Sequence, residues 1–123
     1  MATLNNKVFD QGLSVLDTDA DKITITSQEA TTYTEANATY ALGASTSVSI
    51  AAPSDRSGGG REVVVSAVSD GSVTGTGTAT HYALVDVSES LLLATGTLTA
   101  SQSVTSGNTF TLGSFTIGIP DPA

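Results

Sequence analysis

Turn signals recur at short intervals through the second half of this sequence, and their spacing constrains the fold most strongly. They include the Asp-Gly pair within SDGS (69–72), the cluster SES (88–90) and the cluster TSGN (105–108). Runs rich in Val, Ile, Leu and Thr lie between them, which is typical of short antiparallel strands. We therefore expect a mainly β fold, an antiparallel β-sandwich or barrel of the Ig-like or jelly-roll-like kind.

One amphipathic helix is predicted ahead of the strands, in TLNNKVFDQGLSVLD (3–17). Its apolar residues fall within one half of the helix circumference: Leu4, Val8, Phe9, Leu13, Val15 and Leu16. Thr3 is the expected N-cap, while Gly12 weakens the middle of the helix. This segment is expected either to close one end of the sheet or to form an arm that docks on a partner.

Five segments and one long run read as strands. They are KITITS (22–27), TSVSIA (46–51), REVVVSAVS (61–69), the run 73–87, LLLATGTLT (91–99) and TFTLGSFTIGI (109–119). In the last segment Phe110 and Leu112 are out of phase with Phe115 and Ile117, which predicts a bulge near Gly113. We expect one domain over 1–123, with a helix or arm at 1–20, the β-sandwich at 22–119 and an extended tail at 120–123.

Composition excludes several classes of function. The chain of 123 residues has no cysteine, so neither disulfides nor thiolate metal sites can form. Its formal net charge of -8 argues against a nucleic-acid partner, because binding to phosphates depends on clustered Lys and Arg. No apolar run is long enough for a membrane span, and the N-terminus lacks the pattern of a secretory signal.

The stretch GTGTATHYALVD (75–86) contains the single histidine of the chain and is the first place to look for chemistry. Gly75 and Gly77 are followed by Thr80, so the dinucleotide fingerprint fails. His81 and Asp86 would point to opposite faces of a strand, and the chain has no G-x-S-x-G motif. We predict no catalytic residue and no cofactor, and expect that this protein is not an enzyme.

Three aspartates with alternate spacing, Asp17, Asp19 and Asp21, match the first ligand positions of a calcium loop. Lys22 replaces the turn glycine, and Gln28 stands where a bidentate Glu is required. We predict no metal site of this type. Looser binding of a cation by the three carboxylates remains an open alternative to a solvated turn.

The loop APSDRSGGGRE (52–62) reads as the most flexible internal segment, and it carries Arg56 and Arg61, two of the four basic residues. Arginine forks suit carboxylates on a partner, although a solvated loop with incidental charges is the alternative. The candidate residues for contact with a partner or with other copies are Arg56, Arg61, Tyr33 and Tyr40.

Several stretches together resemble a family of small virion proteins of tailed bacteriophages. They are KVFDQGLSVLDTDADKITITSQEATTYTEANATYALG (7–43), GGREVVVSAVS (59–69), TGTATHYALVD (76–86), LLLATGTLTASQSVTSGNTFTL (91–112) and FTIGIPDPA (115–123). The resemblance covers nearly the whole chain. It implies a head decoration or cement protein on the outer surface of the capsid, with the major capsid protein as partner and no catalytic residues.

The resemblance also fits a homo-oligomer, for which a trimer is one allowed state, because weak contacts gain strength when many copies engage one lattice. A tail, neck or fibre-associated β-sandwich is the alternative virion role. Outside virions, the alternative is a β-sandwich interaction module, such as one that binds carbohydrate through Tyr33, Tyr40 or Tyr82.

Overall fold

The computed structural model describes residues 5–120 and confirms a mainly β, antiparallel fold with one short N-terminal helix. Its residues gather into two compact units, each built from segments that are far apart in the sequence. We name them the helix unit (5–19, 49–67 and 113–120) and the sheet unit (20–48 and 68–112). The expectation of a single domain stays a prediction. Thr3 and Leu4 of the predicted helix, and 121–123 of the predicted tail, lie outside the described residues.

The helix unit combines one helix with a three-stranded antiparallel sheet of order β3-β4-β9. Its elements are α1 (Asn6–Asp19), β3 (Ser54–Asp55), β4 (Arg61–Val65) and β9 (Phe115–Ile119). Helix α1 contacts β4. Its side chains Phe9, Leu13 and Leu16 are buried, as are Val63 and Val65 of β4. Burial of these apolar side chains supplies the main driving force that holds helix and sheet together.

Helix α1 begins two to three residues later than the sequence suggested, because Asn5 provides the cap. The Asn5 side-chain oxygen accepts a hydrogen bond of 2.9 Å from the backbone N–H of Lys7. This bond satisfies one of the N–H groups that have no partner inside a helix.

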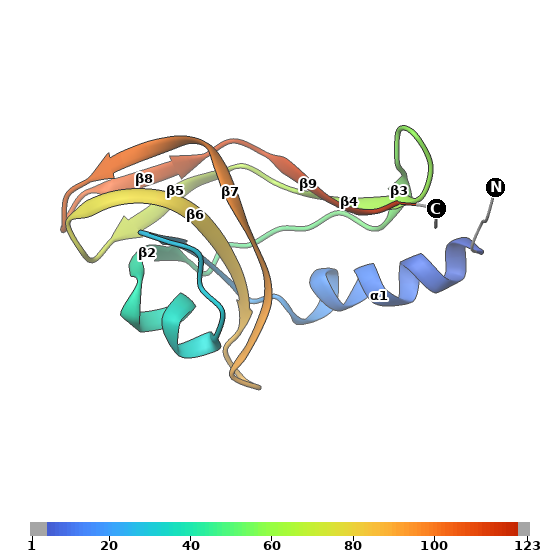
Figure 1. Cartoon of the computed structure of the whole chain (residues 1–123), viewed down its shortest axis with the longest axis horizontal. Helices are drawn as coiled ribbons and strands as arrows, with labels where there is room; N and C mark the ends of the chain where they lie inside the picture. The colour runs from blue at the N-terminus through green and yellow to red at the C-terminus, as the bar shows by residue number, and fades with distance from the viewer. Residues whose placement is uncertain (1–4, 121–123) are drawn as a thin grey trace. The chain divides into compact units, whose positions relative to one another are not determined.

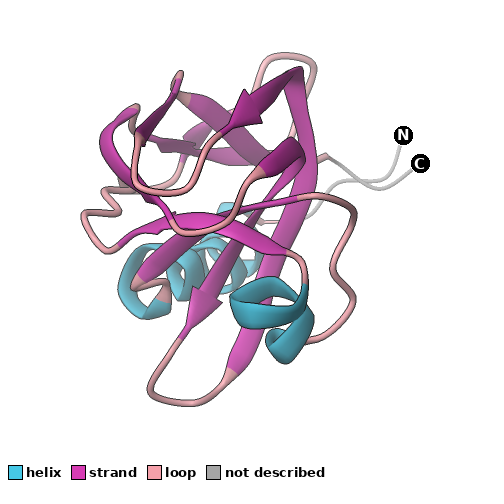
Figure 2. Ribbon diagram, turned by 90° about the vertical axis from the view of Figure 1, so that its left-hand side faces the viewer, coloured by secondary structure: helices cyan, strands magenta, loops and turns pink. Residues whose placement is uncertain are grey.

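The sheet unit is a six-stranded antiparallel sheet of order β7-β6-β1-β2-β5-β8. Its strands are β1 (Lys22–Thr26), β2 (Ala41–Ser45), β5 (Val68–Val73), β6 (Gly77–Asp86), β7 (Leu91–Val104) and β8 (Thr109–Leu112). The strands curl together so that the sheet forms half of a barrel (Figure 1), and the curvature of the strands is also visible from the side (Figure 2).

Strand β1 confirms the strand predicted at KITITS, but it is buried on both faces. Ile23 and Ile25 face one way as expected, while Thr24 and Thr26 are also buried. The Thr24 hydroxyl donates to the carbonyl of Ala36 at 2.9 Å, and the Thr26 hydroxyl donates to Gln28 at 2.8 Å. Ala36 belongs to η1 (Glu35–Thr39), a turn of π-helix. The threonines are therefore buried without losing hydrogen bonds.

Two strands that the sequence predicts as continuous are each broken, and the predicted bulge near Gly113 is wrong. REVVVSAVS divides into β4 and β5, and TFTLGSFTIGI divides into β8 and β9. Strands β5 and β8 pair in the sheet unit, whereas β4 and β9 pair in the helix unit. The reversal of phase between Leu112 and Phe115 thus marks the point where the chain leaves one sheet for another.

The Asp-Gly pair of SDGS was predicted to form a hairpin turn, but it lies within β5. Gly71 pairs with Phe110 of β8, and a Cβ at position 71 would lie 2.3 Å from Cε1 of that ring. Asp70 accepts hydrogen bonds from the Ser45 and Ser47 hydroxyls, both at 3.1 Å. Gly71 is required because the Phe110 ring packs against it, and Asp70 accepts hydrogen bonds from two serines. Neither residue therefore indicates a turn.

The strand predicted at TSVSIA (46–51) is also wrong, because β2 lies just before it. Within 46–51 only Ile50 makes a β-bridge, to Val65. Strand β2 uses small residues instead, and a Cβ at Gly43 would lie 2.7 Å from the Ser72 carbonyl oxygen and 3.0 Å from Phe110. Close packing in the middle of the sheet therefore outweighs the β-propensity of Val48 and Ile50.

Candidate functional site

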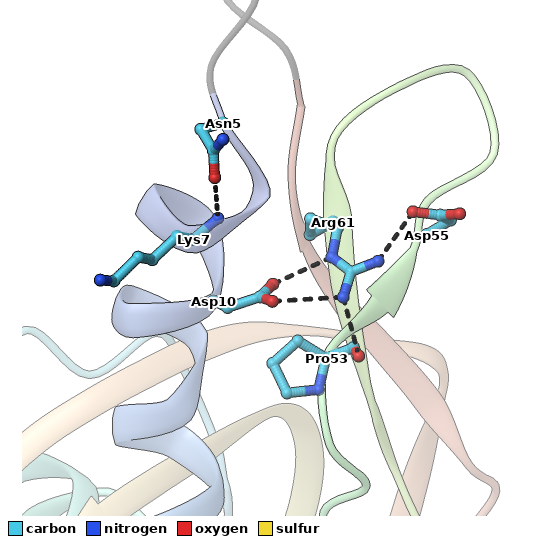
Figure 3. Close-up of polar contacts among 6 residues, drawn as sticks. All are labelled: Asn5, Lys7, Asp10, Pro53, Asp55 and Arg61. Carbon is cyan, nitrogen blue, oxygen red and sulfur yellow. Dashed lines mark hydrogen bonds and ion pairs between the residues drawn. The ribbon is translucent and has the colours of Figure 1, made fainter.

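Arg61 is the centre of a polar cluster in the helix unit (Figure 3). Its Nε and Nη2 donate to the two oxygens of Asp10 at 2.9 and 3.2 Å. Its Nη1 donates to Asp55 at 2.7 Å, and Nη2 also donates to the Pro53 carbonyl at 3.2 Å. Hydrogen bonding to Asp10, followed by Asp55, raises the pKa of Arg61. The Arg61 side chain is only 16% exposed.

This geometry changes the interpretation of Arg61. A guanidinium that grips one carboxylate with a two-pronged fork is committed to that partner. Arg61 therefore ties α1 to β4 and fixes the segment that leads into β3, and it is not a free cation for an external partner. The sequence could not reveal this, because Asp10 is separated from it by 51 positions.

Arg56 lies in the loop between β3 and β4, which projects beyond the ends of these strands (Figure 1). The loop is closed by two backbone hydrogen bonds, from Arg56 N–H to Gly60 and from Gly59 N–H to Arg56, both at 3.1 Å. Gly58, Gly59 and Gly60 all have positive φ, a conformation that favours glycine. These bonds and dihedral angles give the loop the geometry of a turn, and its predicted flexibility stays a prediction.

The Arg56 side chain remains available at the surface of this loop. Its Nη1 donates to the Gly59 carbonyl at 3.0 Å, and its methylene chain passes over Gly118. Within residues 5–120, Gly59 is the one hydrogen-bond partner of this guanidinium. The remaining N–H groups can donate to acceptors on another molecule.

Tyr33 and Tyr40 belong to the sheet unit, whereas Arg56 and Arg61 belong to the helix unit. Both are partly buried and pack against a cluster of Ala30, Ala36, Ala83 and Val85, with Leu92 beside them. The tyrosines therefore help to close this cluster.

Glu35 orders the segment that carries the two tyrosines. Its Oε1 accepts hydrogen bonds from the backbone N–H and the hydroxyl of Thr31, both at 2.8 Å. The backbone hydrogen bond from Thr31 lowers the pKa of Glu35 most, followed by the Thr31 hydroxyl, and Tyr40 adds to the effect. The segment 31–40 is held by this carboxylate.

His81 and Asp86 both lie on β6 but bond to different groups. The Thr80 hydroxyl donates to the Ser27 carbonyl at 3.0 Å and lies 2.8 Å from His81 Nδ1. Asp86 accepts from the Ser88 hydroxyl at 2.7 Å and the Glu89 N–H at 3.2 Å. The His81 ring therefore contacts its neighbour on the strand, and the Asp86 carboxylate contacts the turn that follows.

The three aspartates do not converge on one point. Asp19 accepts a hydrogen bond from the Thr18 hydroxyl, and Asp21 accepts one from the Val87 N–H at 2.9 Å. Across residues 5–120, no three His, Asp or Glu side chains come together as a possible metal site. Nor does the described part of the chain contain a helix long and apolar enough to cross a membrane.

The helix unit exposes an apolar surface on α1 and β9. Val8 is 57% exposed, Val15 42% and Ile119 of β9 38%, although the sequence placed Val8 and Val15 in the same apolar half of the helix as the buried Phe9 and Leu13. Gly12 lies between the two valines on the same face, and a Cβ there would meet Ile119 Cδ1 at 3.8 Å. We call Val8, Gly12, Val15 and Ile119 the α1 patch.

The Asp10–Arg61 pair explains why the predicted and observed helix faces differ. Asp10 follows Val8 by two positions, which is about 200° around a helix. With Asp10 held against β4, Val8 must point away from the sheet. A pattern of apolar residues alone cannot fix the rotation of a helix when its apolar arc is wider than the surface that covers it.

Comparisons with protein-family models, curated proteins and solved structures found no match for this chain.

Proposed function

We propose that this protein is a structural virion protein, a decoration or cement protein that binds the major capsid protein on the outer surface of a bacteriophage head and stabilises the shell. The proposal includes no catalytic step and no cofactor. Its starting point is the family resemblance, which extends over nearly the whole chain.

The single structural observation that supports this role best is the loop 56–60. The loop is held in one turn by its own backbone bonds, and Arg61 fixes the strand that precedes it through Asp55 and Pro53. A preformed loop loses little conformational entropy on binding. Arg56, the first residue of this loop, has guanidinium N–H groups that can donate to carboxylates or carbonyls of a capsid subunit.

The internal packing is also suited to a structural role. Among the described side chains, no buried nitrogen or oxygen lacks a hydrogen-bond partner. Such satisfied polar groups favour one well-ordered conformation. A net charge of -8 would disfavour adhesion to nucleic acid released from host cells.

The test uses heads assembled without this protein from the major capsid protein of the same phage. Added protein should co-sediment with these heads at a fixed ratio to the capsid subunit and should raise the temperature at which they break. Binding to purified tails, with none to heads, would instead favour the tail, neck or fibre role. Binding to neither would contradict both virion roles.

A matched pair of variants tests the loop. Arg56→Ala should weaken binding to heads about tenfold or more, in the range expected for loss of an interfacial arginine. Ser101→Asp changes the net charge by the same amount at an exposed position of β7, and it should leave binding nearly unchanged. Equal effects of the two variants would show that overall charge, rather than the loop, controls binding.

A further inference from the structure

The α1 patch leaves apolar side chains in water on a helix that is otherwise well packed. Val8 and Val15 are more exposed than any other large apolar side chain of the helix unit. Scattered apolar residues on a surface are ordinary, but these two share one helix face with Gly12 and adjoin Ile119. A second surface of matching shape and charge could cover them.

The charges of α1 indicate what that surface is. Lys7 lies in the first turn, while Asp17 and Asp19 lie in the last turn. This order opposes the helix macrodipole, whose N-terminal end favours negative charge and whose C-terminal end favours positive charge. No acidic side chain in the first turn and no basic side chain in the last turn compensates for it. Within one copy, both ends of α1 therefore lack their favoured charges.

We propose that α1 pairs with α1 of a second copy of this chain, antiparallel, about a two-fold axis near Gly12. In this arrangement the lysine-bearing end of each helix approaches the aspartate-bearing end of the other. Lys7 of one copy then lies near Asp19 of the other, and the two macrodipoles oppose each other. The charged side chains and the helix macrodipoles of the two copies then both interact favourably.

The spacing of the apolar residues fits the same axis. Val8 precedes Gly12 by about 6 Å along the helix and Val15 follows it by about 4.5 Å, at 1.5 Å per residue. A two-fold axis near Gly12 therefore places Val8 of each copy beside Val15 of the other. Gly12 adds no side chain near the axis, and Ile119, which adjoins this position, extends the apolar surface there.

This self-pairing is independent of the proposed role on phage heads. It requires only the chain itself, so it is measured on purified protein with no head present. A two-fold contact of this kind is isologous and builds dimers or assemblies of dimers.

The first experiment measures molar mass by sedimentation equilibrium over about a hundredfold range of concentration, since association depends on concentration. We expect a monomer–dimer equilibrium. Val8→Gln with Val15→Gln should raise the dissociation constant about tenfold or more, and glutamine keeps the helix at least as favourable as valine does. The control is Val87→Gln with Leu91→Gln, two exposed apolar residues of the sheet unit, which should leave the constant unchanged.

The second experiment tests the axis, and it uses the absence of cysteine from the chain. Gly12→Cys should form a disulfide-linked dimer on mild oxidation, because the two introduced thiols face each other at the axis. Val8→Cys alone should link poorly, whereas a mixture of Val8→Cys and Val15→Cys chains should link to each other. Val87→Cys is the control for random collision.

The third experiment tests the charges. Lys7→Glu should weaken dimerisation, and Lys7→Glu combined with Asp19→Lys should restore it. A wild-type protein that stays monomeric, or an oligomer unaffected by Val8→Gln with Val15→Gln, would overturn this pairing. So would efficient linking of Val8→Cys chains to one another, which would indicate parallel helices. Loss of head binding by the valine variant of a monomeric protein would assign the patch to the capsid instead.

Discussion

Arg61 of β4 holds both carboxylate oxygens of Asp10 on α1, at 2.9 and 3.2 Å. These two hydrogen bonds favour the same rotation of the helix as the burial of its apolar side chains. In that rotation Phe9 and Leu13 are buried, whereas Val8 and Val15 are exposed.

Replacing Arg61 tests this role. Arg61→Ala should lower the midpoint of thermal unfolding, because Asp10, Asp55 and the Pro53 carbonyl all lose their donor. Arg61→Lys should recover only part of the loss, since an ammonium group cannot form the two-pronged contact. Arg56→Ala is the matched control, because its guanidinium bonds within the described chain only to Gly59. Equal destabilisation by Arg56→Ala would contradict the assignment.

Replacing Gly71 tests the packing inside the sheet unit. A methyl group at position 71 would lie 2.3 to 2.5 Å from three carbons of the Phe110 ring, which is buried. Gly71→Ala should therefore reduce the free energy of unfolding by about 1–3 kcal/mol, the usual cost of overpacking. Urea denaturation monitored by circular dichroism measures this change.

The control for Gly71 uses a glycine in open space. Gly113 has no atom within 4 Å of the position its Cβ would take, so Gly113→Ala should have a much smaller effect. If the two variants are equally stable, Phe110 does not occupy the place described for it.

The strands buried on one or both faces were largely predictable, because local β-propensity and tertiary packing agree there. KITITS became β1, and the turns SES and TSGN connect β6 to β7 and β7 to β8. SDGS and TSVSIA failed for the opposite reason. Gly71 and Gly43 are small because Phe110 covers them, a contact between distant segments that no local pattern reveals.

Glu35 gives the protein a defined dependence of stability on pH. Hydrogen bonds from Thr31 lower its pKa below the ordinary value of 4.5, so the folded state favours the ionised carboxylate. The resulting stabilisation is fully present above the unfolded-state pKa and is lost as the pH falls through the lower folded-state pKa.

The prediction for Glu35 compares unfolding midpoints between about pH 6 and about pH 3. Glu35→Gln should be less stable than wild type at the higher pH, and the difference should shrink toward the lower pH. Glu29→Gln removes an exposed carboxylate from the same region and serves as the control. If the difference in unfolding midpoint between Glu35→Gln and wild type does not change with pH, the ionised carboxylate does not have this role.

Gly12 lies inside a helix, where alanine is favoured by about 1 kcal/mol. A Cβ there would make an ordinary contact with Ile119 at 3.8 Å. Gly12→Ala should therefore raise the free energy of unfolding of the monomer by about that amount, measured at low protein concentration. A loss of stability would mean that Ile119 lies closer to α1 than described.

The candidate contact residues show where sequence analysis stops. Arg56 remains at the surface as expected, but Arg61 is held by Asp10, and Tyr33 and Tyr40 close an internal cluster. A sequence identifies residue types suited to binding a partner. Which of them are already occupied depends on contacts between segments that are brought together only by folding.

The most direct measurement of the central claim is electron microscopy of heads assembled without this protein and then incubated with it. A decoration protein should add density at regular lattice positions on the outer surface, and Arg56→Ala should reduce the occupancy of these positions at the same concentration. Heads that remain bare, while added protein is found on tails or stays free in solution, would contradict a role in capsid decoration.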